Sequence, residues 1–191
     1  MEQITLKLTG TSPLMQHNVQ LVDDLRPATK RLAEAVAESK AKKTDAARMA
    51  MRRAEFDAGI YHDDKIGPYI PSTWIMKSMR DTAALTKKGK GIERGVMPLE
   101  DRCAIVYDGP RDLDGLWAAS FFDCRAIGVN TAKTMRTRPF FAKWSTTCSF
   151  VFEPQLIDRK TLLSFAQQAG SLMGIGDARR LRFGRFDAEA V

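Results

Sequence analysis

The chain has 191 residues, a length that fits one domain with room for an insertion. Hydrophobic residues make up 44% of it, which excludes the composition of a disordered chain and allows a packed core. No hydrophobic run approaches the roughly 18 residues that a membrane span needs. The formal net charge of +7 favours polyanionic partners and decides nothing about the fold.

The N-terminus and the cysteines bear on the compartment. Hydrophobic and polar residues alternate from Ile4 to Leu8, and the basic start and hydrophobic block of a secretion signal are missing. Three cysteines, Cys103, Cys124 and Cys148, form no C-x-x-C pair and stand far from both histidines, a pattern typical of reduced thiols. We therefore expect a cytoplasmic protein with no metal site and no cofactor.

The first third of the chain predicts one strand and two helices. The alternation over residues 4–8 predicts a half-buried strand. Residues 26–43 and 44–58 are rich in Ala, Lys, Glu and Arg, which favour helix. The hydrophobic stripes of these helices are thin, so we expect an inserted helical region, residues 25–58, within a single domain that spans residues 1–191.

The middle of the chain predicts shorter elements. A hairpin is expected around residues 63–67, and Ser72 is expected to cap a helix that runs to about Leu85. Residues 86–95 are rich in glycine and lysine and are expected to form a flexible basic loop. Two strands with a short helix between them are expected over residues 102–107, 112–120 and 124–129.

The last third contains the clearest strand pattern. Hydrophobic residues alternate strictly from Trp144 to Phe152, and Asp158 is expected to cap a helix that ends at Gly174. A final strand is expected over residues 180–183, with Arg180 and Arg182 on one face. Without the insertion, the order of elements is β-α-β-β-α-β, which predicts an α+β fold with a ferredoxin-like (RRM-like) core.

The C-terminal segment, residues 174–186, carries the strongest functional signal. Its glycines allow positive φ angles and close approach to a ligand, and the arginines that follow have no acid between them. Guanidinium groups suit phosphates, and aromatic rings suit unstacked bases. An ordinary edge strand with solvated arginines is the alternative. The candidate binding residues here are Gly174, Gly176, Arg179, Arg180, Arg182 and Arg185.

Two further segments are basic. In residues 133–143 the candidates for phosphate contacts are Lys133, Arg136 and Arg138, and the candidates for base stacking are Phe140 and Phe141, unless both rings lie in the core. The least specific candidates are the loop residues Lys87, Lys88, Lys90 and Arg94, since lysine-rich loops are commonly only solvated. Basic and aromatic residues in this combination favour single-stranded nucleic acid, RNA or DNA, with little sequence preference.

Signals for catalysis are poor. The pair Gly174-x-Gly176 follows a predicted helix and is not a dinucleotide fingerprint, and residues 87–91 lack the spacing of a phosphate-binding P-loop. His17 and the cluster His62–Asp64 are the remaining candidates for a catalytic or metal role. We therefore expect a protein that is not an enzyme, with a nuclease as the low-ranked alternative.

Residues 68–80 resemble a segment of the RAMP superfamily, the ferredoxin-like RNA-binding proteins that include backbone subunits of CRISPR effector complexes. The family begins its first helix with I-P-G-S-S-L-x-G-x-x-R. Here Ser72 and Arg80 match that pattern, while Thr73 and Met79 depart from its small residues. The resemblance implies a single-strand-binding surface and head-to-tail assembly along the strand, and it does not imply ribonuclease activity.

A second part of the resemblance is the glycine-rich segment after the last predicted helix, with Gly174, Gly176 and the ending Phe183–Phe186. The chain also resembles a group of small bacteriophage proteins that carry Met-Arg-Thr-Arg-Pro, residues 135–139 here, and a terminal Gly-Arg-Phe. This second resemblance implies a location in the cytoplasm of a host cell.

Three functions remain open at this point. The first is non-enzymatic binding of single-stranded nucleic acid, as a phage-encoded filament whose copies self-associate. The second is an interaction factor that docks onto a host ribonucleoprotein complex or mimics one of its subunits. The third is a nuclease that uses His17 or the His62–Asp64 cluster.

Overall fold

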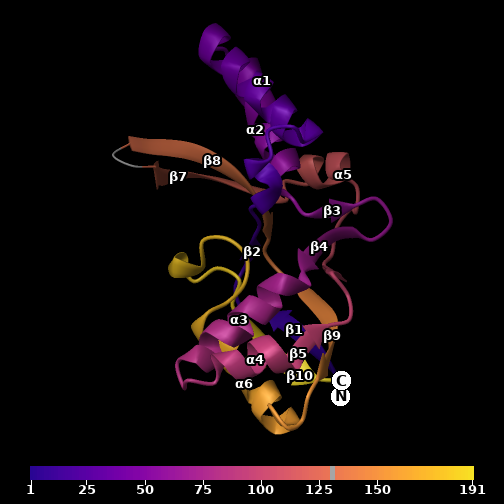
Figure 1. The fold of residues 1–191 in the computed structure, drawn as a ribbon. Coiled ribbons are helices and arrows are strands. Elements are labelled where there is room, and N and C mark those ends of the chain that lie inside the picture. The colour runs from indigo at the N-terminus through magenta and orange to yellow at the C-terminus, as the bar shows by residue number, and fades with distance from the viewer. Residues whose placement is uncertain (130–131) are drawn as a thin grey trace. The chain divides into compact units, whose positions relative to one another are not determined.

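The computed structural model describes residues 1–129 and 132–191 (Figure 1). They form two compact units. Unit 1 comprises Met1–Met15, His62–Asp108 and Phe141–Val191, and unit 2 comprises Gln16–Tyr61 and Gly109–Phe140. The predicted insertion over residues 25–58 is thus part of a unit that also takes in a second, distant stretch of chain. Within the described residues, no helix has the length and hydropathy needed to cross a bilayer.

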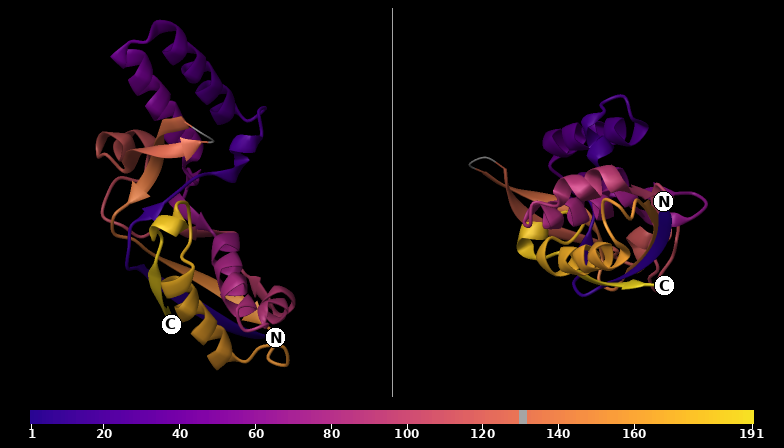
Figure 2. Two further views of the ribbon diagram at one scale, coloured as in Figure 1. Left: turned by 90° about the vertical axis from the view of Figure 1, so that its left-hand side faces the viewer. Right: turned by 60° about the horizontal axis from the view of Figure 1, so that its bottom comes forward.

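Unit 1 is built on an antiparallel sheet with the strand order β10-β1-β9-β5. Its strands are β1 (Glu2–Gly10), β5 (Val96–Pro98), β9 (Ser145–Phe152) and β10 (Phe186–Ala190). Helices α3 (Ser72–Ala84) and α6 (Arg159–Leu172) pack against each other and lie over one face of this sheet (Figures 1 and 2). The chain order β1-α3-β5-β9-α6-β10, with the fourth strand beside the first, is that of a ferredoxin-like domain. The predicted α+β fold class is confirmed.

The core of unit 1 follows from the alternation in its two central strands. In β1, Ile4, Leu6 and Leu8 are buried, and each faces a residue of β9, with Ile4 opposite Phe150 and Leu6 opposite Cys148. Because side chains alternate between the two faces of a strand, one face of each strand enters the core. The predictions for both strands are therefore confirmed.

A second, smaller sheet in unit 1 has the order β3-β4-β6. Its strands are β3 (His62–Asp63), β4 (Gly67–Pro71) and β6 (Arg102–Ala104). The predicted hairpin around residues 63–67 joins the first two. The short strand β2 (Leu14–Met15) also belongs to the chain segments of this unit. Cys103 and Cys148 are buried, and both are free thiols, as is Cys124.

Two local predictions for unit 1 are wrong. Residues 86–95 are not a loop throughout, because Gly89–Gly95 forms helix α4, which Ile92 anchors in the core with no exposed surface. Ser72 does not cap α3 through its side chain: Pro71 is the N-cap residue, and the Ser72 hydroxyl is buried and makes no hydrogen bond to a described residue.

Unit 2 contains a helical hairpin and a strand hairpin. The two predicted helices are present as α1 (Pro27–Lys42) and α2 (Asp45–Gly59), which pack against each other, and the Thr44 hydroxyl caps α2. Its other elements are the short helices η1 (Val19–Val22) and α5 (Leu113–Ala118) and the paired strands β7 (Phe122–Val129) and β8 (Ala132–Phe141). The Phe56 ring is fully buried, with its centroid 5.6 Å from that of Trp117 and 6.4 Å from that of Phe122. These rings form the centre of the core that joins the two sequence segments of unit 2.

Candidate nucleic-acid interface

The residues between α6 and β10, Gly174–Arg185, form a compact loop in unit 1, called here the glycine-rich loop (Figure 1). Two of its glycines are required by the backbone. Gly176 has φ +81°, and a Cβ atom there would lie 2.5 Å from the Met15 carbonyl oxygen. Gly184 has φ +68°, and a Cβ atom there would lie 1.8 Å from the Ile175 carbonyl oxygen. Only glycine fits both conditions at these positions.

The predicted final strand over residues 180–183 is wrong. Arg179–Leu181 forms a 3-10 turn, η2, flanked by Ala178 and Arg182 in the left-handed conformation at φ 54° and 66°. The residues whose alternation of hydrophobic and basic side chains predicted a strand thus lie in and just after this turn. Strand β10 begins only at Phe186. The arginines therefore project from a folded loop and not from a sheet edge.

Hydrogen bonds from other segments of unit 1 hold the glycine-rich loop in place. The Ser12 hydroxyl accepts from the Arg185 backbone N–H at 2.9 Å and donates to the Arg182 carbonyl at 2.8 Å. The Ser78 hydroxyl, on α3, donates to the Gly174 carbonyl at 2.9 Å, and the Gly184 N–H donates to the Pro13 carbonyl at 2.8 Å. A loop fixed in this way loses little conformational entropy when a ligand binds.

Arg185 has two buried donors and lies near two other arginines of the loop. Its Nε and Nη1 atoms make no hydrogen bond to residues 1–129 or 132–191, while Nη2 donates to the Arg179 carbonyl at 3.4 Å. Burial lowers the pKa of Arg185 below its ordinary value, and the positive charges of Arg182 and Arg179 lower it further. Buried donors without acceptors are costly, so an anion placed beside Arg185 would relieve both the missing hydrogen bonds and the repulsion between the three guanidinium groups.

An aromatic side chain that the sequence reasoning passed over lies beside this loop. Trp74, in the first turn of α3, is half-buried, and its Cζ3 atom lies 3.5 Å from the Cβ position at Gly176. Phe183, within the loop, is also half-buried. The signal for Trp74 was present, since it stands inside the segment that resembles the RAMP superfamily, two residues after Ser72. An aromatic ring of α3 thus lies beside the backbone of the glycine-rich loop at Gly176.

Arg136 and Arg138 occupy a different environment from the predicted one. Both lie in β8 of unit 2 and pair with the buried Glu55, whose Oε1 atom is 3.2 Å from Arg136 Nη1 and 3.7 Å from Arg138 Nη1. Arg138 itself is only 8% exposed. The expectation that these two guanidinium groups hold the phosphates of a strand is corrected, because both pair with Glu55 inside unit 2 and Arg138 has too little exposed surface to contact a polymer. Lys133, on the same strand, is exposed.

The two predicted stacking residues also differ from expectation. Phe141 has no exposed surface, and its ring packs edge-on against Tyr107 with centroids 5.0 Å apart. It is a core residue of unit 1 and does not stack on bases. Phe140 is half-buried at the end of β8, where its backbone N–H donates to the Phe121 carbonyl.

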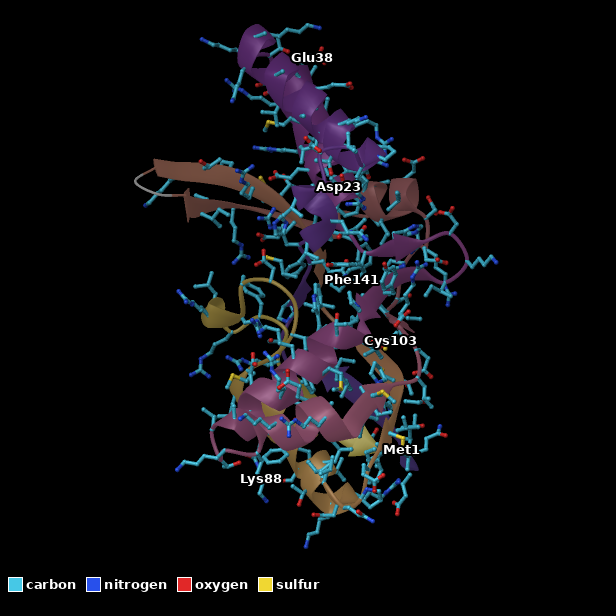
Figure 3. All side chains as sticks on the ribbon, in the orientation of Figure 1. Met1, Asp23, Glu38, Lys88, Cys103 and Phe141 are labelled. Carbon is cyan, nitrogen blue, oxygen red and sulfur yellow. The ribbon has the colours of Figure 1, made fainter. Side chains whose placement is uncertain are left out.

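The basic residues around α4 do not join the glycine-rich loop. Lys87, Lys88, Lys90 and Arg94 are all exposed. Lys88 is labelled in Figure 3. It lines a small cavity together with Gly91 and with Asp158 and Thr161 at the start of α6. The glycine-rich loop follows the other end of α6, and a helix of 14 residues is about 21 Å long. Lys88 and the glycine-rich loop therefore adjoin opposite ends of that helix.

The histidine candidates for catalysis or metal binding are His62, with its neighbouring aspartates in unit 1, and His17 in unit 2. Asp63 pairs with Arg102 and accepts the Lys65 backbone N–H at 2.9 Å, and backbone hydrogen bonds of this kind lower its pKa below the ordinary value. The Nδ1 atom of His62 is 3.9 Å from Asp64. Among residues 1–129 and 132–191, no three His, Cys, Asp or Glu side chains are grouped so as to hold a metal ion. His17 lines a cavity in unit 2, described below.

Comparisons with known proteins add little to this picture. No family model matches the chain, and no curated protein is similar to it in sequence. Among solved structures, the crystal structure of Cmr6 from Pyrococcus furiosus is similar over 98% of each chain, with 12% sequence identity and a TM-score of 0.37. With so low an identity and TM-score, this similarity says nothing about what the chain binds.

Proposed function

We propose that this protein binds single-stranded nucleic acid, RNA or DNA, through the glycine-rich loop of unit 1 and that it is not an enzyme. The observation that carries the proposal is the environment of Arg185. Two of its guanidinium nitrogens are buried and have no acceptor in the part of the chain that the structure describes, and the neighbouring charges of Arg182 and Arg179 act on it. Phosphate oxygens supply the missing acceptors and the missing negative charge, and guanidinium groups bind them in a bidentate manner.

Single strands suit this loop better than duplexes. The half-buried ring of Trp74 lies beside the glycine-rich backbone, where an unstacked base can pack on it. Every base has an aromatic face, so contacts to phosphates and rings give little sequence preference. A reader of duplex DNA would present a helix to the major groove, whereas Arg179 and Arg180 here stand in a short 3-10 turn, and Arg182 and Arg185 follow it.

The test is a titration of fluorescently labelled oligonucleotides by anisotropy at several salt concentrations. The logarithm of the association constant is expected to fall linearly with the logarithm of the salt concentration, with a slope of about −0.7 for each phosphate neutralised. The variant in which Arg179, Arg182 and Arg185 are replaced by Gln is expected to lose most of the affinity and most of this slope.

A variant with the same loss of charge elsewhere is the matched control. Lys87, Lys88 and Lys90 are exposed at the other end of α6, and their replacement by Gln is expected to leave most of the affinity in place. If both variants weaken binding equally, only net charge matters and the loop is not the site. If the unmodified protein fails to bind at low salt, the proposal is wrong.

We propose in addition that copies of the chain assemble head-to-tail along the strand in the cytoplasm of a phage-infected host. The resemblance to the RAMP superfamily and to small bacteriophage proteins supports this arrangement. Electron microscopy of the purified protein with and without a long single strand tests it. Regular fibres that appear only with the strand are expected, and isolated particles on the strand would count against assembly.

Docking onto a host ribonucleoprotein is the second candidate function, and an exposed hydrophobic patch of unit 2 favours it. Val19, Val22 and Leu25 are 64%, 91% and 72% exposed, which is unusual for large hydrophobic side chains so close together in sequence. A pull-down from nuclease-treated lysate separates the two functions. A protein partner retained after nuclease treatment supports docking, and a partner lost with the nucleic acid supports direct binding.

We do not propose a nuclease. Both carboxylate oxygens of Glu55, the acid that lines the same cavity as His17, are engaged, one by Arg136 and one by the Thr137 backbone N–H at 2.8 Å. A base that already accepts these hydrogen bonds is poorly placed to take a proton from a substrate. Incubation with RNA and with DNA, with and without magnesium, is expected to leave both intact.

A further inference from the structure

Unit 2 contains a cavity of about 440 Å³ that the nucleic-acid proposal does not use. One wall is hydrophobic: α1 contributes Leu32, Ala33 and Val36, and β7 contributes Ile127. Ligand sites in proteins commonly measure roughly 300 to 1,000 Å³ and are lined mostly by hydrophobic groups with a few polar ones. The volume and the hydrophobic wall both fall within that description.

The opposite wall carries an unequal set of charges. Glu55 is 4% exposed and Arg138 is 8% exposed, and both line the cavity together with Arg136. Charged groups are buried at a high cost unless they are paired, and here two guanidinium groups share one carboxylate. Among the described residues that line the cavity, Glu55 is the one acid. The formal charges of these three lining side chains therefore sum to +1.

A hydroxyl group in the same cavity lacks a partner. The Thr29 Oγ1 atom, in the first turn of α1, is buried and makes no hydrogen bond to the described residues. Buried polar atoms in native proteins are nearly always hydrogen-bonded, so an orphan hydroxyl that faces a cavity calls for an acceptor or a donor from a ligand or water.

We propose that this cavity binds a small amphipathic monoanion, a molecule with a hydrophobic body and one carboxylate. The body lies against the wall formed by α1 and β7. The carboxylate lies beside Arg136 and Arg138, where it balances the excess positive charge, and it accepts a hydrogen bond from Thr29. Since all these residues belong to unit 2, the proposal does not depend on the function proposed for the glycine-rich loop.

The chemistry of the ligand is tested by calorimetric titration of the full chain with three probes of equal chain length. Octanoate is expected to bind, octanol to bind at least tenfold more weakly, and octylammonium not to bind. Equal affinity for octanoate and octylammonium would overturn the proposal, because the excess charge would then play no part. Absence of octanoate binding at millimolar concentration would overturn it as well.

The location is tested with two matched variants in α1. Ala33 lines the cavity and is exposed at its rim, so Ala33→Trp fills the space without burying a new side chain elsewhere and is expected to abolish octanoate binding. Ala41 is also exposed on α1, about 12 Å further along, and Ala41→Trp is expected to bind as the unmodified chain does. Octanoate binding that survives Ala33→Trp would place the ligand elsewhere and overturn the assignment.

A third variant tests the charge. Arg136→Gln is expected to weaken octanoate binding about tenfold and to leave octanol binding unchanged, since the neutral probe has no charge for the guanidinium group to pair with. An equal loss for both probes would mean that the variant damages the cavity, and the charge assignment would fail. Oligonucleotide affinity is expected to stay the same in the Ala33→Trp and Arg136→Gln variants, so failure of this proposal is distinguishable from failure of the first.

Discussion

The Ser12 hydroxyl accepts a hydrogen bond from the backbone N–H of Arg185 at 2.9 Å across a separation of 173 residues in the chain. The same hydroxyl donates to the Arg182 carbonyl at 2.8 Å, so one side chain joins the start of the chain to both sides of the turn that follows η2. The position of the arginine side chains therefore depends on a contact with a distant segment of unit 1. A substitution at Ser12 is expected to shift the loop while all of its arginines are kept.

Ser12→Ala is expected to weaken oligonucleotide binding several-fold while all four loop arginines remain. The loss of one hydroxyl that serves two backbone groups is expected to cost about 1 kcal/mol of unfolding free energy. Urea denaturation and anisotropy titration measure the two effects. Ser171→Ala, at an exposed serine of α6, is the control and is expected to change neither quantity measurably. Unchanged affinity in Ser12→Ala would show that the loop binds without this anchor.

Gly184→Ala is expected to destabilise unit 1 by more than the ~1 kcal/mol that a left-handed conformation alone costs an alanine. The added Cβ atom would lie 1.8 Å from the Ile175 carbonyl oxygen, so the backbone of the loop must also move. Gly91→Ala, in helix α4, meets its first neighbour at 3.5 Å and is expected to be neutral or slightly stabilising, because alanine favours helix. Chemical denaturation of both variants measures the difference, and equal stability would contradict the conformation of the loop.

Glu55→Gln is expected to destabilise unit 2 by about 3 kcal/mol, because it leaves the positive charges of Arg136 and Arg138 without their counter-charge. The change keeps the shape of the side chain, removes its charge and replaces one of its two accepting oxygens by an NH2 donor. Glu38→Gln is the control: Glu38 pairs with Lys42 at the surface of α1, and its loss is expected to cost no more than about 0.5 kcal/mol. Similar small losses in both variants would mean that the guanidinium groups of β8 find other acceptors.

The parts of the fold that the sequence predicts are those that short-range patterns decide. The alternation in β1 and β9 predicts which side chains enter the core, and the Asp158 cap predicts where α6 begins. In these segments the local pattern and the tertiary packing favour the same structure. The ferredoxin-like order of elements follows from them once the inserted segments are set aside.

The candidate site could be predicted only in part, because contacts between distant residues decide the rest. Leu181 and Phe183 alternate with arginines as a strand would, yet that segment folds into a turn, in which the Ser12 hydroxyl donates to the Arg182 carbonyl and the Pro13 carbonyl accepts from the Gly184 N–H. Arg136 looks free in sequence, and its partner Glu55 lies 81 residues earlier. The sequence predicts a glycine-rich basic segment at residues 174–186. It contains no local signal for which arginines a distant carboxylate will neutralise.

The pH dependence of stability includes a contribution from Asp158. Hydrogen bonds from the hydroxyl and the backbone N–H of Thr161, at 2.7 and 2.9 Å, lower the pKa of this carboxyl below its ordinary value. Because the pKa is lower in the folded state, the stabilisation is complete above the ordinary aspartate pKa of about 3.9 and is lost as the pH falls through the lowered value. Asp158→Ala is therefore expected to be less stable than the unmodified chain at neutral pH, with a difference that closes in acid. A difference that does not change with pH would contradict the role of the charged form.

Trp74 is predicted to form the stacking platform of the glycine-rich loop. Stacking of a base on an aromatic side chain contributes about 1–3 kcal/mol, so Trp74→Ala is expected to lower oligonucleotide affinity about tenfold or more, whereas Trp74→Phe keeps a ring and is expected to retain most of it. Anisotropy titration compares the two variants, and tryptophan fluorescence adds an independent measurement, because a base stacked on the indole is expected to quench it. The part of the quenching that belongs to Trp74 is expected to be missing in both variants. Equal affinity in Trp74→Ala and Trp74→Phe would mean that the ring serves the packing of α3 against the loop and that phosphate contacts alone hold the strand.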